Sequence, residues 1–97
     1  SIIKGGENIS PGGIEEALYP RPVVAEAAFI GMKDPVYGED IKAFVTLKPK
    51  ETATPEDIRE FCKTRLKNFY VPKEVVILNQ MPKTLVGKIL KKELRKL

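Results

Sequence analysis

Two apolar segments separated by a strong turn signal constrain the fold more than any other part of this sequence. Residues 23–32 are rich in small and apolar side chains, which predicts a buried strand. In residues 41–48 apolar and polar side chains alternate, which predicts a second strand with one buried face. Because Lys33-Asp34-Pro35 between them favours a turn, we expect the two strands to pair antiparallel.

One well-defined helix and a third strand complete the predicted core. Thr54-Pro55 predicts the start of the helix, because threonine caps helix N-termini and proline is favoured at the first helical position. Cys62 lies on the apolar stripe of this helix, where a free cysteine behaves as a small hydrophobe in the core. Residues 74–78 predict the third strand.

Shorter helices are expected near both ends of the chain. Ser10-Pro11 predicts the start of the first of them. Leu90, Leu94 and Leu97 have a spacing that places them on one face of the last. The predicted fold class is α+β: a small three-stranded, mainly antiparallel sheet covered by helices on one side, with a short N-terminal strand pair or turn.

The length of 97 residues fits one domain with a single core. A ligand pocket of roughly several hundred Å³ is hard to enclose in so short a chain, so we expect any small-molecule site to be shared with a second body. A single cysteine excludes an internal disulfide, and the absence of histidine excludes a His/Cys zinc site and a histidine-based triad. We therefore expect no metal site in this chain.

The net charge of +4 is concentrated near the C-terminus, where Glu93 is the only acid after Lys83. Such a basic surface attracts polyanions, and nucleic acid is one class of partner to consider. No recognised nucleic-acid motif accompanies the charge, and the aromatic residues are scattered rather than gathered into a stacking platform. We expect no nucleic-acid partner.

No apolar run approaches the roughly 20 residues that a membrane-spanning helix needs. The N-terminus also lacks the charged and apolar regions of a signal peptide. We therefore expect a cytoplasmic protein without a membrane span.

The leading candidate for a functional residue is Lys88, which follows Gly87 in a predicted surface loop before the last helix. Gly87 supports the loop, because glycine allows a positive φ and a close approach of backbone. The Lys88 ammonium is a compact charge that suits a phosphate or carboxylate oxygen. The pattern is not a P-loop, because Pro82 replaces its first glycine and Ile89 its Ser/Thr. The alternative interpretation is the solvated face of a basic helix.

Two longer motifs lie at opposite ends of the chain. The first is IIKGGENISPGGIEE at residues 2–16, and the second is PKTLVGKILKKEL at residues 82–94. Together with shorter stretches at residues 24–28, 38–45 and 71–73, these motifs resemble the C-terminal domain of the AMP-forming acyl-CoA synthetases, the adenylate-forming superfamily. The resemblance covers essentially the whole chain.

Enzymes of this superfamily use ATP to join a carboxylic acid to AMP, and then pass the acyl group to a thiol such as that of CoA. The resemblance implies that Lys88 is the catalytic lysine of adenylation, where a cation lowers the repulsion between the carboxylate and the α-phosphate. It also implies that ATP and Mg²⁺ bind mainly to a larger domain, which this sequence does not include.

The resemblance assigns a second site to Lys4, Gly5, Gly6 and Glu7. It implies that this loop contacts the substrate or CoA during thioester formation, after the domain swings about a hinge. Adjacent glycines fit this role, because their missing side chains leave a narrow groove lined by free amides. The alternative is a tight turn that only joins a short strand to the first helix.

Residues 1–97 are therefore expected to be the C-terminal lid domain of an acyl-CoA synthetase, with the N-terminal domain of the same enzyme as partner. The hinge residue and the phosphate loop of that enzyme are absent from the sequence, and we expect the isolated domain to be inactive. The expected ligands are a carboxylic acid, ATP and CoA, with CoA preferred over a carrier-protein thiol. The alternatives are a free-standing basic module that binds CoA or an acyl carrier, and a nucleic-acid binder.

Overall fold

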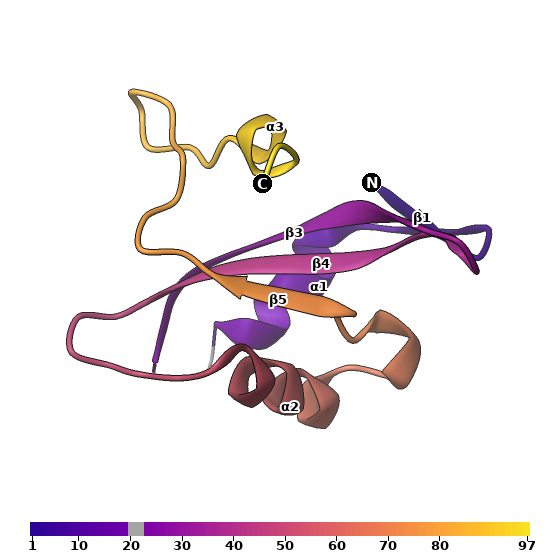
Figure 1. Cartoon of the computed structure of the whole chain (residues 1–97), viewed down its shortest axis with the longest axis horizontal. Coiled ribbons are helices and arrows are strands. Elements are labelled where there is room, and N and C mark those ends of the chain that lie inside the picture. Colours follow the sequence, from indigo (N-terminus) through magenta and orange to yellow (C-terminus); the bar gives the residue numbers. More distant parts are fainter. Residues whose placement is uncertain (20–22) are drawn as a thin grey trace.

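The computed structural model describes residues 1–19 and 23–97 and centres on a three-stranded sheet (Figure 1). The strands of this sheet, in their spatial order, are β3 (Val24–Asp34), β4 (Gly38–Leu47) and β5 (Glu74–Ile77). A separate hairpin precedes them and consists of β1 (Ile2–Lys4) and β2 (Glu7–Ile9). The helical elements are α1 (Pro11–Glu15), α2 (Pro55–Arg65) and α3 (Lys91–Leu94), with the 3₁₀ turns η1 (Glu16–Leu18) and η2 (Asn68–Tyr70).

The sheet contains one antiparallel and one parallel pair of strands. β3 and β4 pair antiparallel up to Asp34 opposite Gly38, which confirms the predicted pair. The connecting turn covers residues 35–37 and so begins two residues later than predicted, because Lys33 and Asp34 still pair with β4. β5 lies along the other edge of β4 in parallel, with Lys42 opposite Glu74. A parallel neighbour requires a long crossover connection, and residues 48–73, which include α2, supply it.

The predicted helix starts are confirmed at α1 and α2. α1 begins at Pro11 after Ser10, although the Ser10 side chain makes no capping hydrogen bond. At α2 the Thr54 hydroxyl accepts a hydrogen bond from the Asp57 amide (3.1 Å), and the Asp57 carboxylate accepts one from the Thr54 amide (2.9 Å). This reciprocal cap satisfies two backbone donors that a helix N-terminus otherwise leaves unpaired.

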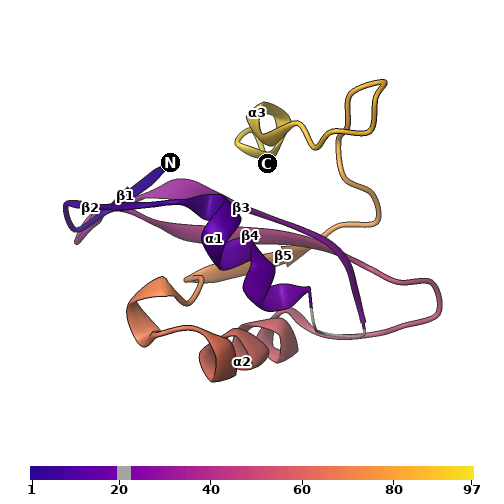
Figure 2. The ribbon, with the colours of Figure 1, turned by 180° about the vertical axis from the view of Figure 1, so that it is seen from behind.

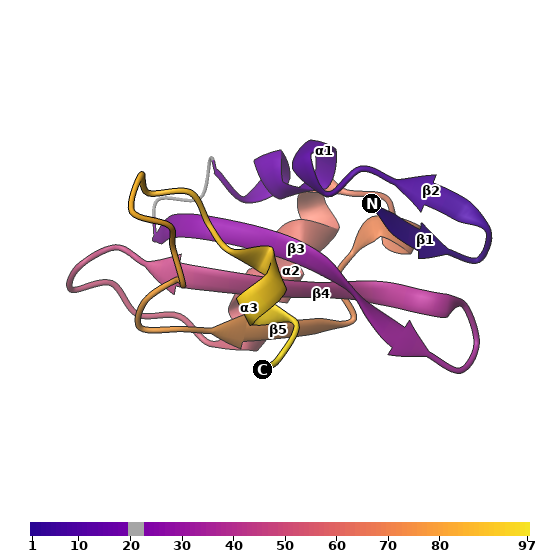
Figure 3. The same cartoon turned by 90° about the horizontal axis from the view of Figure 1, so that it is seen from above.

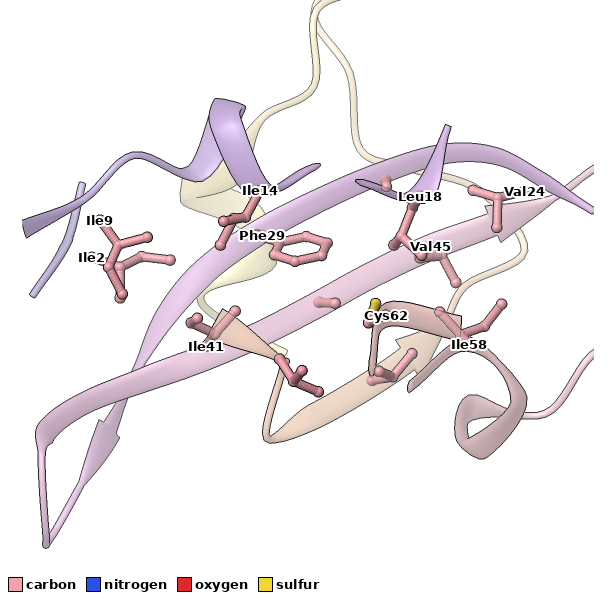
Figure 4. Packing of buried hydrophobic residues seen from close by; sticks show 14 residues of the cluster. Ile2, Ile9, Ile14, Leu18, Val24, Phe29, Ile41, Val45, Ile58 and Cys62 are labelled. Carbon is pink, nitrogen blue, oxygen red and sulfur yellow. The ribbon is translucent and has the colours of Figure 1, made fainter. Parts of the chain in front are cut away.

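One face of the sheet packs against α1 and α2 to form the main hydrophobic core (Figures 2 and 4). Phe29 from β3 and Val45 from β4 are completely buried there. Leu18 from η1 and the two residues Ile58 and Cys62 from α2 reach the same core from the helical side. The prediction of Cys62 as a core residue is therefore confirmed.

The opposite face of the sheet is also covered, which corrects two predictions: helices on one side only, and a strand at 41–48 with one buried face. Phe44 of β4 and Ile30 of β3 form a second cluster with Met81 and Leu94 from the C-terminal segment. In Figure 3 α3 lies over this face, with α2 on the far side. Phe44 is an apolar residue among the polar positions of β4, and a second buried face explains it.

The last helix is shorter than the leucine spacing predicts. α3 ends at Leu94 after a single turn, with Leu90 as its N-cap. Leu94 is completely buried, whereas Leu97 lies beyond the helix and is mostly exposed. In the part of the chain that the structure describes, no helix is long and apolar enough to cross a membrane.

Candidate functional site

Residues 83–89 form a small hairpin that carries Gly87 and Lys88 away from the sheet (Figure 1). An antiparallel bridge between Lys83 and Ile89 closes the base of this hairpin. Ile89 also packs against the second hydrophobic cluster, so the base is tied to the core. The expectation of a surface loop at residues 87–88 is confirmed, because both residues are exposed.

The tip of the 83–89 hairpin has a defined turn geometry. The Gly87 amide donates a hydrogen bond to the Thr84 carbonyl (2.9 Å). Gly87 has a φ of 86°, whereas Leu85 and Val86 have negative φ values. These features describe a type I turn followed by a left-handed residue, a common three-residue hairpin loop. The positive φ expected for Gly87 is therefore present.

Lys88 combines a fixed backbone with an exposed side chain. The Lys88 amide donates to the Thr84 hydroxyl (3.1 Å), and the Lys88 carbonyl accepts from the Thr84 amide (2.8 Å). Within residues 1–19 and 23–97, the Lys88 ammonium forms no ion pair and no hydrogen bond. Such an ammonium is available to an anion that another domain or molecule brings.

Two ion pairs connect the ends of the hairpin to the rest of the domain. The Lys83 ammonium lies 2.5 Å from a carboxylate oxygen of Glu26 on β3. After the hairpin, the Lys91 ammonium lies 2.6 Å from Glu15 of α1, which also accepts a hydrogen bond from the Phe29 amide. These pairs are partly exposed, so each contributes little stability.

Gly5 and Gly6 form the two-residue turn between β1 and β2, with Lys4 opposite Glu7. Their φ values of 56° and 83° are both left-handed, as a type I′ hairpin turn requires. A Cβ atom at Gly5 would lie 3.3 Å from the Tyr37 ring, whereas one at Gly6 would meet nothing within 4 Å. Gly6 therefore borders open space at the end of the hairpin.

The Lys4 side chain points into the domain, which corrects the expectation that residues 4–6 all form a surface loop. Lys4 is only 5% exposed. Its ammonium lies 3.1 Å from Asp40 and donates a hydrogen bond to the Phe69 carbonyl (2.7 Å). It also lies over the rings of Tyr37 and Phe69. Because these groups surround the ammonium, the Lys4 side chain anchors the β1–β2 hairpin to the rest of the domain.

Glu7 is tied to η2 by a hydrogen bond that the Tyr70 hydroxyl donates to the Glu7 carboxylate. This hydrogen bond is the main reason that the pKa of Tyr70 lies above its ordinary value. Burial and the negative charge of Glu7 also raise this pKa. The Glu7 side chain therefore links β2 to η2.

Sequence reasoning does not identify the residues that support the glycine turn. The Gly5 amide donates to the Tyr37 carbonyl (2.9 Å), and the rings of Tyr37 and Phe69 meet edge to face with centroids 5.7 Å apart. Asp40 neutralises Lys4. These residues lie far from Gly5 along the chain, so no spacing rule connects them to it, and only the folded structure brings them together.

The turn between β3 and β4, which supports Gly5, is organised by Asp34. Its carboxylate accepts hydrogen bonds from the amides of Val36 (3.0 Å) and Tyr37 (2.9 Å) and lies 2.6 Å from the Lys73 ammonium. The hydrogen bond from Lys73, followed by that from the Tyr37 amide, holds the pKa of Asp34 below its ordinary value.

Acid is therefore expected to weaken this turn. Because the folded Asp34 has the lower pKa, the unfolded state binds the extra proton, and the stability that Asp34 contributes is lost as the pH falls below about 4. Between about pH 5 and pH 2, the Asp34→Asn variant should lose less free energy of unfolding than the unchanged domain. Urea denaturation of both proteins at the two pH values measures this difference. Equal losses would contradict the assigned role of Asp34.

The two candidate sites lie at opposite ends of the long axis of the domain (Figures 1 and 3). The 83–89 hairpin projects away from the sheet near the end that the connection from β4 to α2 forms, and the turn between β1 and β2 forms the other end. The domain extends 38 Å along this axis, and the two sites therefore lie on well-separated parts of its surface.

Known proteins resemble this chain over nearly its full length. The family described as AMP-binding enzyme C-terminal domain matches residues 13–88. The probable acyl-activating enzyme 4 of Arabidopsis thaliana is 46% identical over 97 residues, which cover 99% of this chain and 18% of that protein. The mitochondrial medium-chain acyl-CoA ligase of Rattus norvegicus is 44% identical over 94 residues, which cover 97% of this chain and 15% of that protein.

The fold agrees with the sequence relationship. The crystal structure of an acyl-CoA synthetase from Brucella canis matches with a TM-score of 0.87 and 38% identity, covering 98% of this chain and 18% of that one. This chain therefore spans less than a fifth of the length of these relatives. The two terminal motifs, the identity along the chain and the shared fold lead to one assignment: this chain belongs to the family of AMP-binding enzyme C-terminal domains.

Proposed function

We propose that this chain is the mobile C-terminal domain of an ATP-dependent, AMP-forming acyl-CoA synthetase. In this proposal Lys88 serves adenylation, and the loop of Lys4, Gly5, Gly6 and Glu7 serves thioester formation. The observation that carries the proposal is the exposed Lys88 ammonium on a hydrogen-bonded hairpin, in a chain of this family. Because the relatives are more than five times as long as this chain, the remaining polypeptide supplies the rest of the active site.

In the adenylation step a carboxylate oxygen attacks the α-phosphorus of ATP, and pyrophosphate leaves with the electrons of the broken bond. Both reactants are anions, and negative charge moves onto the phosphate oxygens. A protonated Lys88 held beside these oxygens offsets that charge, and it does so more strongly in a water-excluded cleft than in bulk water. The hydrogen bonds between the Lys88 backbone and Thr84 fix the position of the Lys88 backbone, so only the side-chain torsions remain to be ordered when the ammonium binds.

In the thioester step the domain has swung about its hinge, so that the turn between β1 and β2 faces the acyl-adenylate. The thiol sulfur of CoA attacks the acyl carbon, the bond from that carbon to the phosphate oxygen breaks so that AMP leaves, and the thiol proton passes to solvent. The open space at Gly6 accommodates the narrow pantetheine arm beside the backbone. Lys4 and Glu7 hold the turn through Asp40 and Tyr70, and we assign their contacts with CoA to the backbone.

ATP and Mg²⁺ are assigned mainly to the N-terminal domain of the same enzyme, which is the proposed partner. Among the described residues, no group of three or more His, Cys, Asp or Glu side chains could hold a metal ion. The carboxylic acid is not assigned, because the pocket for it belongs to the partner domain in this proposal. The cytoplasm stays a prediction, and one relative is named as mitochondrial.

Replacing Gly6 by leucine tests the role of the glycine turn. In the full-length enzyme, the Gly6→Leu variant should form the thioester about tenfold to a hundredfold more slowly, because the new side chain occupies the space of the pantetheine arm. Adenylation by the same variant should remain close to normal. The two half-reactions are measured separately, by pyrophosphate exchange and by thioester formation from supplied acyl-adenylate.

Gly38→Leu is a matched control for this variant. Gly38 has the same φ of 83° as Gly6, and a Cβ atom there also meets nothing within 4 Å. Both variants therefore place a leucine at the same left-handed φ, but Gly38 is the first residue of β4 and lies outside the turn between β1 and β2. If Gly38→Leu slows thioester formation as much as Gly6→Leu, or if Gly6→Leu slows adenylation equally, the loop serves only as scaffold.

A further inference from the structure

The tip of the 83–89 hairpin is apolar, although it projects into solvent. Leu85 is 107% exposed and Val86 is 89% exposed, so both side chains are essentially free of contacts with their own domain. They occupy the two central positions of the type I turn, where proline and small polar residues are usual. Two adjacent, fully exposed apolar residues at a projecting tip are typical of an interaction surface.

The fold of this domain does not require either residue to be apolar. Neither Leu85 nor Val86 belongs to either hydrophobic cluster of the described residues. The turn is held by backbone hydrogen bonds between Thr84, Gly87 and Lys88, which do not depend on the side chains at the tip. No packing within the described residues therefore accounts for apolar side chains at these two positions, and Lys88, the residue proposed for adenylation, is close to them along the chain.

We infer that the Leu85-Val86 tip docks into an apolar recess of the larger N-terminal domain during adenylation and so sets the position of Lys88. This inference rests on the proposed function. The larger domain is the occupant that the geometry favours, because Lys88 follows the tip on the same hydrogen-bonded hairpin, and a surface that receives the Lys88 ammonium lies close to Leu85 and Val86. The charge of Lys88 attracts anions over a range of distances, whereas apolar contact forms only when the tip is fully inserted.

Apolar docking also explains how the domain favours one orientation over another. In any orientation that leaves the tip in water, Leu85 and Val86 stay hydrated. Their burial stabilises only the orientation in which Lys88 is inserted, and it shifts the population of the domain toward that state. The hairpin is already ordered, so docking loses little conformational entropy.

The test is a double variant, Leu85→Ser with Val86→Asn, in the full-length enzyme. Both new residues suit the turn, so the hairpin keeps its shape. Adenylation measured by pyrophosphate exchange should fall about tenfold, because two apolar contacts are lost. Thioester formation from supplied acyl-adenylate should be unchanged. The conservative double variant Leu85→Met with Val86→Ile should retain adenylation, because both new side chains are apolar. If adenylation needed leucine and valine specifically, this variant would lose it.

Val36→Asn is the control for loss of an exposed apolar residue at a turn, because Val36 is 79% exposed in the turn between β3 and β4. It should leave adenylation unchanged. Lys88→Ala is assayed in parallel, so that the inference and the proposed function can fail separately. If Lys88→Ala stops adenylation but the polar tip does not slow it, the inference is wrong and the proposed function stands.

Three other results would overturn the inference. One is an equal loss in both half-reactions of the polar tip variant, which would indicate a general structural defect. Another is a change in oligomeric state by sedimentation, which would make a second copy the partner of the tip. The third is normal adenylation by Lys88→Ala, which would remove the proposed function together with the inference.

Discussion

Lys88→Ala in the full-length enzyme is expected to slow the formation of acyl-adenylate by about 10²–10³, the usual effect of removing one preorganised charge-stabilising donor. The Lys88 side chain is exposed and, within the described residues, has no partner, so its removal should not disturb the fold. Formation of the thioester from supplied acyl-adenylate should be spared, because Lys88 and the β1–β2 turn lie at opposite ends of the domain. Pyrophosphate exchange and single-turnover thioester formation measure the two steps.

Lys92→Ala provides the matched control for charge. Lys92 is another exposed lysine close to the same hairpin, and the described part of the chain offers it no ion pair. Its removal should leave both half-reactions unchanged, because a general basic surface is not what adenylation requires. Equal loss of both half-reactions in Lys88→Ala would refute the assignment of Lys88, as would an equal effect of Lys92→Ala.

Phe29→Ala is expected to destabilise the domain by about 3–5 kcal/mol, the range for removing a buried aromatic side chain. Phe29 is completely buried at the centre of the main core, among Leu18, Val45 and Cys62 (Figure 4). The free energy of unfolding of a domain is usually only about 5–15 kcal/mol, so this loss is a large part of the total stability. Urea denaturation of the domain, followed by circular dichroism, measures the change.

Two further variants calibrate the effect of Phe29→Ala. Phe29→Leu should destabilise less, because the leucine side chain fills part of the cavity. Val36→Ala, at an exposed position, should change stability by less than about 0.5 kcal/mol. A loss below about 1 kcal/mol in Phe29→Ala would contradict the packing around this ring. In the full-length enzyme, Phe29→Ala should weaken both half-reactions together, unlike Lys88→Ala.

Features that depend on neighbouring residues were predictable from the sequence. The antiparallel pair follows from alternation and the turn at Asp34, and the start of α2 follows from Thr54-Pro55. The positive φ of Gly87 and the exposure of Lys88 follow from the same kind of local pattern. The catalytic role of Lys88 is a proposal that the half-reaction assays decide.

Features that depend on distant contacts were not predictable. The alternation in β4 predicts one buried face, but Phe44 is buried by Met81 and Leu94, which arrive from the end of the chain. Lys4 lies beside two glycines and has the appearance of a loop residue, yet Asp40 and the Phe69 carbonyl bind its ammonium inside the domain. No spacing in the sequence relates these partners to one another.

The sequence by itself therefore indicated the family, the order of most elements, the surface loop at Gly87 and the leading candidate residue. The family follows from the resemblance of the two terminal motifs, whereas the other properties arise from backbone preferences and periodicities that act over a few residues. Only the tertiary structure decided that the sheet is covered on both faces, that Lys4 is an anchor, and that the two candidate sites lie at opposite ends of the domain. Burial and charge pairing depend on which segments, distant in the sequence, come into contact, and these contacts exist only in the folded chain.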